Sequence, residues 1–160
     1  MINRIDKAVF TLEKAASMVL LMILVGDVLF GILFRFTNVT FTTGVEIATF
    51  LLIWLGLLGA SMATYKGSHF NVDFLVKILG ARIQKNIVRI NNMIACVISV
   101  VLAISSAKLV RITWEQYTVM TDIRMGVVLL IVPVSFILIA FHSLVKFMTP
   151  VIEEHVGFQE

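Results

Sequence analysis

The sequence contains little of what disulfide-linked or soluble proteins rely on. A single cysteine, Cys96, excludes a disulfide within the chain and the paired thiols of a thiol-relay enzyme. Two prolines, nine glycines and no low-complexity tract argue against a linker or disordered protein. Charged residues make up only 14% of the 160 residues, against about 25% in an average soluble domain. The composition therefore disfavours a soluble globular domain.

Long apolar runs take the place of those missing features, since 59% of the residues are hydrophobic. A helix of about 20 residues rises far enough to cross a hydrocarbon core about 30 Å thick. The runs predict an all-α membrane protein, one membrane domain over residues 1–160 with four transmembrane helices. We expect the spans at about residues 15–34, 45–66, 88–110 and 125–146.

The second expected span has more internal detail than the other three. Thr43 and Glu46 have the spacing of a capping box, in which each side chain bonds a backbone N–H at the helix start. Trp54 lies near the middle of the span, whereas tryptophan usually prefers the membrane interfaces. Its position indicates a buried protein contact, with a lipid-facing ring as the simpler alternative.

Small residues form a stripe along the same span. At this spacing they let a second helix approach closely in lipid, where packing drives association. The stripe therefore predicts a helix–helix interface. Its members are Gly56, Ala60 and Ala63, with Gly59 beside them.

The connection between the second and third spans is amphipathic at about residues 72–87. Apolar residues recur there every three or four positions, and basic residues occupy the opposite face. We expect a helix on the membrane surface whose basic side chains contact lipid headgroups. A solvated extension of the third span remains the alternative. The headgroup candidates are Arg82, Lys85 and Arg89.

The basic residues also predict the orientation of the chain. Three lie before the first span, five in the connection at 65–89 and one in the tail, against one and three in the other two turns. Because positive charge accumulates in cytoplasmic loops, both termini are expected in the cytoplasm. The net charge of +3 follows from these loops, so no nucleic-acid partner is expected.

Asp27 is the acidic residue placed deep in an expected span. A centred aspartate costs roughly 2.5–3.5 kcal/mol to insert, so a functional role is the default hypothesis. It would serve as a proton relay or, more simply, in a hydrogen bond between helices or between subunits. The second interpretation is favoured, because no other acid or base lies at the same depth.

No catalytic, metal or cofactor motif accompanies these spans. Walker, nucleophile-elbow and glycine-rich phosphate patterns are missing from the sequence, so an enzyme is not expected. His142 is interpreted as a capping or interface residue. A haem-bearing anchor of a redox enzyme is disfavoured, because His69 and His155 lie outside the expected spans.

The second span and its exit contain an ordered pattern of glutamate, tryptophan, Leu-Gly-Ala and His-x-x-Val-Asp. The pattern corresponds to Glu46, Trp54, Leu58-Gly59-Ala60 and His69 to Asp73. It resembles a known family, the small membrane (DctQ-type) subunit of tripartite ATP-independent periplasmic (TRAP) transporters.

The resemblance implies partners in the bacterial inner membrane and no cofactor. In that family a large membrane subunit carries the substrate and sodium sites and moves as an elevator. A periplasmic binding protein delivers an organic anion, such as a sialic acid or a C4-dicarboxylate. The small subunit is similar to a static brace, with Glu46, Trp54, Gly59, His69 and Asp73 as family positions. The alternative is a self-sufficient four-helix exporter that uses Asp27 as a proton site.

Overall fold

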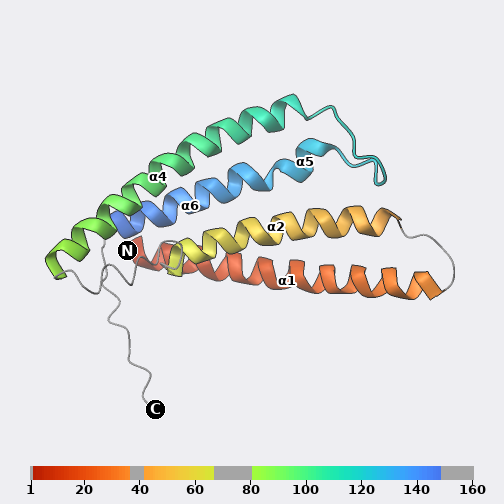
Figure 1. Ribbon diagram of the computed structural model, residues 1–160, viewed down its shortest axis with the longest axis horizontal. Coiled ribbons are helices and arrows are strands. Elements are labelled where there is room, and N and C mark those ends of the chain that lie inside the picture. Colours follow the sequence, from red (N-terminus) through yellow and green to blue (C-terminus); the bar gives the residue numbers. More distant parts are fainter. Residues whose placement is uncertain (1, 37–41, 67–80, 149–160) are drawn as a thin grey trace, which may run out of the picture.

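The computed structural model describes residues 2–36, 42–66 and 81–148 (Figure 1). The helices are α1 (Ile2–Phe36), α2 (Thr42–Lys66), α4 (Ala81–Ile112), α5 (Met125–Leu129) and α6 (Ile131–Met148). No strand occurs in these three ranges, where the one β-bridge joins Tyr117 to Arg124. The predicted all-α class is confirmed.

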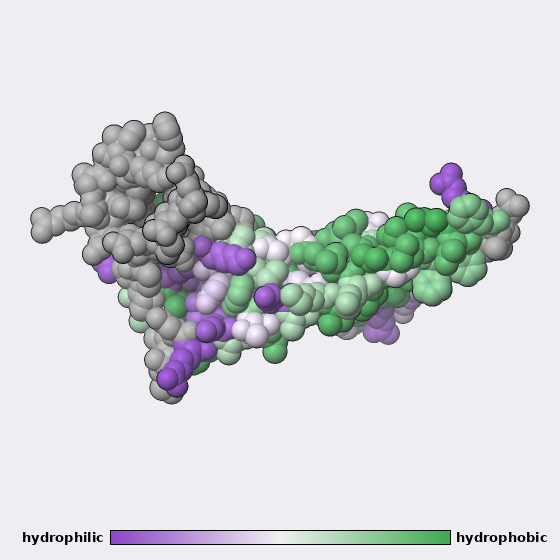
Figure 2. All heavy atoms as spheres, turned by 90° about the horizontal axis from the view of Figure 1, so that it is seen from below, coloured by the Kyte–Doolittle hydropathy of each residue, from purple (hydrophilic) through white to green (hydrophobic). Residues whose placement is uncertain are grey.

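Four helical segments are long and apolar enough to cross a membrane. They run over Arg4–Phe36, Thr42–Lys66, Arg89–Ile112 and Met125–Met148. Only 11% to 33% of the most apolar part of each segment is buried inside the chain, so most of its apolar surface faces outward. Figure 2 shows this surface as a hydrophobic band between two more polar ends. The expected four transmembrane helices are confirmed.

The helices form an open row rather than a closed bundle. Their order across the row is α1, α2, α6 and α4, with neighbours packed side by side (Figure 1). Beyond these neighbours, α1 touches α6 only slightly, and α1 and α4 occupy opposite edges. The row therefore leaves two broad faces to be covered by lipid or by other proteins.

The row has two different ends. The start of α1, the end of α2, the start of α4 and the end of α6 lie together at one end (Figure 1). From there the pair α1 and α2 spreads away from the pair α4 and α6 toward the other end. The four spans therefore alternate in direction along the chain.

The fourth span is interrupted near its start. Pro133 has no N–H, so the carbonyl of Leu129 lacks its usual helical partner, and the span divides into α5 and α6 around Leu130. Leu130 keeps helical angles (φ −56°, ψ −30°), so the two parts continue in nearly the same direction. Pro133 thus causes a local break in the fourth span rather than a change in its direction.

The expected surface helix at 72–87 is only partly within the described residues. α4 begins at Ala81 and continues to Ile112 without interruption, so residues 81–87 extend the third span. This agrees with the alternative of a helical extension. Residues 72–80 lie outside the described part of the chain.

Candidate partner interface and polar anchors

α2 has an inward and an outward face, and the small residues lie on the outward one. Leu58, Ser61 and Thr64 are buried toward the neighbouring helices. Val45, Leu52 and Gly56 are exposed at the spacing of a continuous stripe that leads to half-buried Gly59, Ala60 and Ala63.

The outward stripe is not filled by the chain itself. A methyl group added at Gly56 or Gly59 would meet no atom within 4 Å. Since glycine lowers the stability of a helix by roughly 0.5–1 kcal/mol relative to alanine, two glycines facing open space suit a surface that a second helix contacts.

Trp54 makes a contact between helices inside the chain. Its Nε1 donates a hydrogen bond to the carbonyl oxygen of Val128 on α5, at a distance of 2.9 Å. Val128 lies one residue before Leu129, whose carbonyl loses its donor to Pro133, so the indole joins α2 to the fourth span beside the break. The expected buried protein contact of Trp54 is therefore an intramolecular one.

Glu46 anchors the loop between α4 and α5. Its Oε2 accepts hydrogen bonds from Thr121 N (2.8 Å), Thr121 Oγ1 (2.8 Å) and Met120 N (3.2 Å). Thr43 is already the second residue of α2, so the observed geometry differs from the capping box. The carboxylate of Glu46 instead joins α2 to the loop between α4 and α5.

The anchored loop is itself a small folded hairpin. Thr118 N donates to Ile123 O, and Met125 N donates to Gln116 O. Asp122 turns the chain with a positive φ of 54°, a conformation that aspartate tolerates better than most residues. The loop therefore has a defined shape where α2 and α5 face each other.

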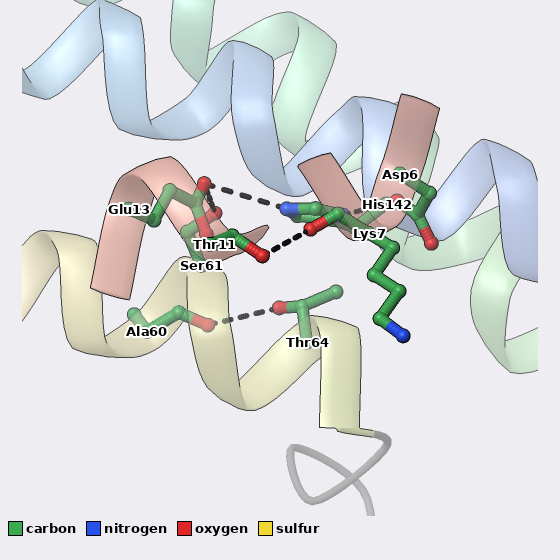
Figure 3. Close-up of polar contacts among 8 residues, drawn as sticks. All are labelled: Asp6, Lys7, Thr11, Glu13, Ala60, Ser61, Thr64 and His142. Atoms are coloured by element: carbon green, nitrogen blue, oxygen red, sulfur yellow. Dashed lines mark hydrogen bonds and ion pairs between the residues drawn. The ribbon is translucent and has the colours of Figure 1, made fainter. Parts of the chain in front are cut away.

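A buried polar cluster joins the other end of the row (Figure 3). His142 Nδ1 on α6 lies 2.5 Å from Asp6 Oδ1, and its Nε2 lies 3.3 Å from Glu13 Oε1, both on α1. Ser61 on α2 donates to the same Glu13 oxygen at 2.7 Å. The exposed fraction is 0% for His142 and Ser61, 7% for Asp6 and 3% for Glu13. Three helices thus meet at one imidazole.

Aromatic rings cover this cluster. Phe10 stacks on Tyr65 with ring centroids 4.2 Å apart, and Tyr65 meets the His142 ring edge-on at 5.4 Å. A low-polarity surrounding strengthens the hydrogen bonds and raises the cost of losing any partner. Some oxygens nearby on α1 and α6 stay without a hydrogen bond: Glu13 Oε2, Ser17 Oγ, Ser135 Oγ and Ser143 Oγ.

The acidic half of the cluster was not predicted from the sequence. Asp6 and Glu13 precede the first expected span at 15–34, whereas α1 is helical from Ile2. Asp6, Glu13 and Ser17 are seven and four residues apart, which places them on one helix face. That spacing was the available signal. The interpretation of His142 as an interface residue holds for the contact of α6 with α1.

Asp27 has a plainer environment than its depth suggested. It is half-exposed on α1, and no hydrogen bond joins it to any side chain that the structure describes. Arg89, one of the headgroup candidates, lies with its guanidinium 5.5 Å from the ring centre of Phe147. The side chains of Arg82 and Lys85, and the family positions His69 and Asp73, lie outside the described residues.

The polar groups do not form a metal site within the described residues. No group of three or more His, Cys, Asp and Glu side chains in residues 2–36, 42–66 and 81–148 is arranged to hold a metal ion. In the cluster, both imidazole nitrogens of His142 already face carboxylates. The arrangement can hold the helices together.

Comparison with known proteins identifies the family. No curated protein sequence matches the chain. A family model described as tripartite ATP-independent periplasmic transporters, DctQ component, matches residues 21–152. The match begins after Asp6 and Glu13 and includes every position on which the resemblance was based. The chain therefore belongs to the DctQ family of TRAP transporter components.

Proposed function

We propose that the chain is the small scaffold subunit of a TRAP transporter and binds the large membrane subunit along the outward face of α2. The open stripe at Gly56 and Gly59 carries this proposal. Both positions leave space that no part of the described chain fills, on a helix fixed from behind by Trp54 and Ser61. A partner helix can approach this face closely.

The open row supports bracing rather than transport by the chain alone. The ionisable side chains of His142 and Glu46 join helices at the two ends, and Asp27 between them forms no hydrogen bond with the described residues. A transport pathway usually needs several polar side chains at the membrane midplane, often on broken helices. At the interruption, the side chains of residues 129–132 are all apolar, so no polar side chain is available there.

The substrate and coupling ion then belong to the assembled transporter. The proposed system takes up an organic anion of the sialic acid or C4-dicarboxylate class, delivered by a periplasmic binding protein and driven by sodium. It lies in the bacterial inner membrane, with the end that holds His142 on the cytoplasmic side. The support is the family membership and the distribution of basic residues.

Co-purification with the large subunit tests the interface. Gly56→Leu should leave the fold of the chain intact, because a side chain there meets open space, but should block the partner helix. Recovery of the large subunit should fall at least about tenfold, the effect of losing about 1.4 kcal/mol of binding. Ala107→Leu, on an exposed face of α4, is the matched control and should retain the complex.

Uptake by the reconstituted complex completes the test. Vesicles that contain both membrane subunits should accumulate a sialic acid or a C4-dicarboxylate when the binding protein and a sodium gradient are present, and potassium should not replace sodium. If Gly56→Leu and Gly59→Leu both assemble fully and support wild-type uptake, α2 is not the interface.

A further inference from the structure

An open cleft lies at the end of the third span, away from the polar cluster. Its volume is about 420 Å³, within the range of about 300–1,000 Å³ that small ligands occupy. Arg111, Ile112, Trp114 and Glu115 line it. The candidate membrane span ends at Ile112, so the cleft lies at the depth where the hydrocarbon core gives way to headgroups.

Two opposite charges face this cleft without neutralising each other. Arg111 and Glu115 are four residues apart, a spacing that would form an ion pair on a continuous helix. α4 ends at Ile112, however, so Glu115 is out of helical register with Arg111. Both side chains are exposed, and neither forms an ion pair with any side chain in the described ranges.

Trp114, which also lines the cleft, is packed against α5. Its ring and backbone pack so closely on Gly126 of α5 that a methyl group at Gly126 would lie 2.6 Å from Trp114 Cε3. The indole is still 39% exposed. A fixed indole at this depth matches the aromatic belt of membrane proteins, where the ring contacts the headgroup layer.

We propose that this cleft binds the headgroup of a zwitterionic lipid with a primary ammonium, such as phosphatidylethanolamine. The Arg111 guanidinium donates hydrogen bonds to the phosphate, a pairing for which its planar fork is well suited. The Glu115 carboxylate accepts hydrogen bonds from the ammonium, and the Trp114 ring offers its face to the same cation. Exposed Ile112 contacts the start of the acyl chains.

The combination of charges selects among common headgroups. Phosphatidylglycerol satisfies Arg111 but leaves Glu115 facing an uncharged, electron-rich glycerol near a phosphate. Phosphatidylcholine has a cation that Trp114 can accept, but its quaternary nitrogen has no N–H to donate to Glu115. Only the primary ammonium satisfies all three side chains. The inference does not depend on the proposed role in a TRAP transporter, since it concerns the isolated chain and its lipid.

Native mass spectrometry of the purified full chain tests the site with phosphatidylethanolamine and phosphatidylglycerol of identical acyl chains. Phosphatidylethanolamine should bind about tenfold more tightly than phosphatidylglycerol, the ratio expected for one hydrogen-bonded charge at about 1.4 kcal/mol. Arg111→Gln should weaken this binding about tenfold. Glu115→Gln should abolish the preference over phosphatidylglycerol. The exchange Arg111→Glu with Glu115→Arg should restore part of that preference.

Matched controls lie at the same end of the molecule. Arg35→Gln removes a basic side chain at the end of α1, and Asp122→Asn removes an acid from the neighbouring hairpin without disturbing its turn. Both should leave lipid binding unchanged. Equal binding of the two lipids by the wild type, or equal losses in the controls and the site variants, would overturn the proposal and indicate non-selective surface lipid.

Discussion

The indole Nε1 of Trp54 lies 2.9 Å from the carbonyl oxygen of Val128, so α2 supplies a hydrogen bond to α5 where the fourth span is interrupted. Pro133 creates this interruption, because it cannot donate to the carbonyl one turn earlier. The carbonyl that loses its donor is that of Leu129. The bond from Trp54 to Val128 is a separate contact, which joins α2 to the fourth span beside the break.

Trp54→Phe should lower the stability of the chain while keeping its fold. The ring still fills most of the same space, but the N–H that bonds Val128 is lost. Hydrogen bonds between transmembrane helices contribute about 0.6 kcal/mol on average and at most about 1.7 kcal/mol, and we expect a loss in this range. The midpoint of thermal unfolding in detergent measures it.

Trp114→Phe is the control for the loss of an indole N–H. Trp114 forms no hydrogen bond through its side chain with the residues that the structure describes. Trp114→Phe should therefore lower the midpoint of thermal unfolding less than Trp54→Phe does. Equal effects of the two variants would mean that ring size, rather than the bond to Val128, determines the change.

His142→Leu should destabilise the chain much more strongly. The imidazole lies against two buried carboxylates, and removing it leaves Asp6 and Glu13 facing an apolar side chain. Breaking a buried charged contact from one side typically costs about 3–5 kcal/mol. Lower expression and a lower unfolding midpoint are the expected observations.

Replacement of the acids together with the histidine should restore much of this loss. Buried charged groups that are replaced together by apolar residues are often neutral for stability. The triple variant Asp6→Leu, Glu13→Leu and His142→Leu should therefore unfold at a higher temperature than the single variant His142→Leu. A triple variant as unstable as the single one would contradict the view that unpaired acids cause the damage.

The fold was largely predictable from the sequence, because length and hydropathy decide which segments cross a membrane. The order of the helices across the row was not. It depends on contacts between side chains far apart in the chain. The hydrogen bond between Glu46 and Thr121 is an example, and no local sequence pattern predicts it. A capping box was a reasonable local interpretation of Glu46, but a tertiary contact uses its carboxylate.

The polar anchors show the same division between local and distant information. Asp27 attracted attention because it interrupts an apolar run, yet it has no polar partner in the described structure. Asp6 and Glu13 lie in a segment that looks like an ordinary charged N-terminus, and only the folded row brings His142 against them. Depth in the sequence thus drew attention to Asp27, whereas the polar contact between the described helices uses Asp6 and Glu13.

Gly126→Ala should destabilise the contact between α5 and the end of α4. The added methyl group would lie 2.6 Å from Trp114 Cε3 and 3.0 Å from Trp114 Cα, so the backbone must move. Overpacking of this kind typically costs about 1–3 kcal/mol. The unfolding midpoint should fall.

Gly26→Ala provides the opposite expectation on α1. A methyl group at Gly26 meets no atom within 4 Å, and alanine is the better helix former by roughly 0.5–1 kcal/mol. Its midpoint should stay equal or rise. If both variants lower stability alike, the close approach of Trp114 to Gly126 is not the cause.

Asp27→Asn distinguishes the proposed scaffold subunit from the alternative function, a self-sufficient exporter that uses Asp27 as its proton site. The carboxylate is half-exposed and forms no hydrogen bond with the described residues, so its loss removes no contact between helices. A charged aspartate costs roughly 2.5–3.5 kcal/mol at the centre of a span, and the amide relieves part of this cost. The variant should assemble with the large subunit, and uptake should stay within about twofold of wild type, since no binding energy is lost.

Gly56→Leu, which should fail to assemble with the large subunit, is the control, and its uptake is measured in vesicles prepared in the same way. Loss of uptake by an intact Asp27→Asn complex would assign this acid a direct role in transport, because assembly and fold would then be excluded as causes.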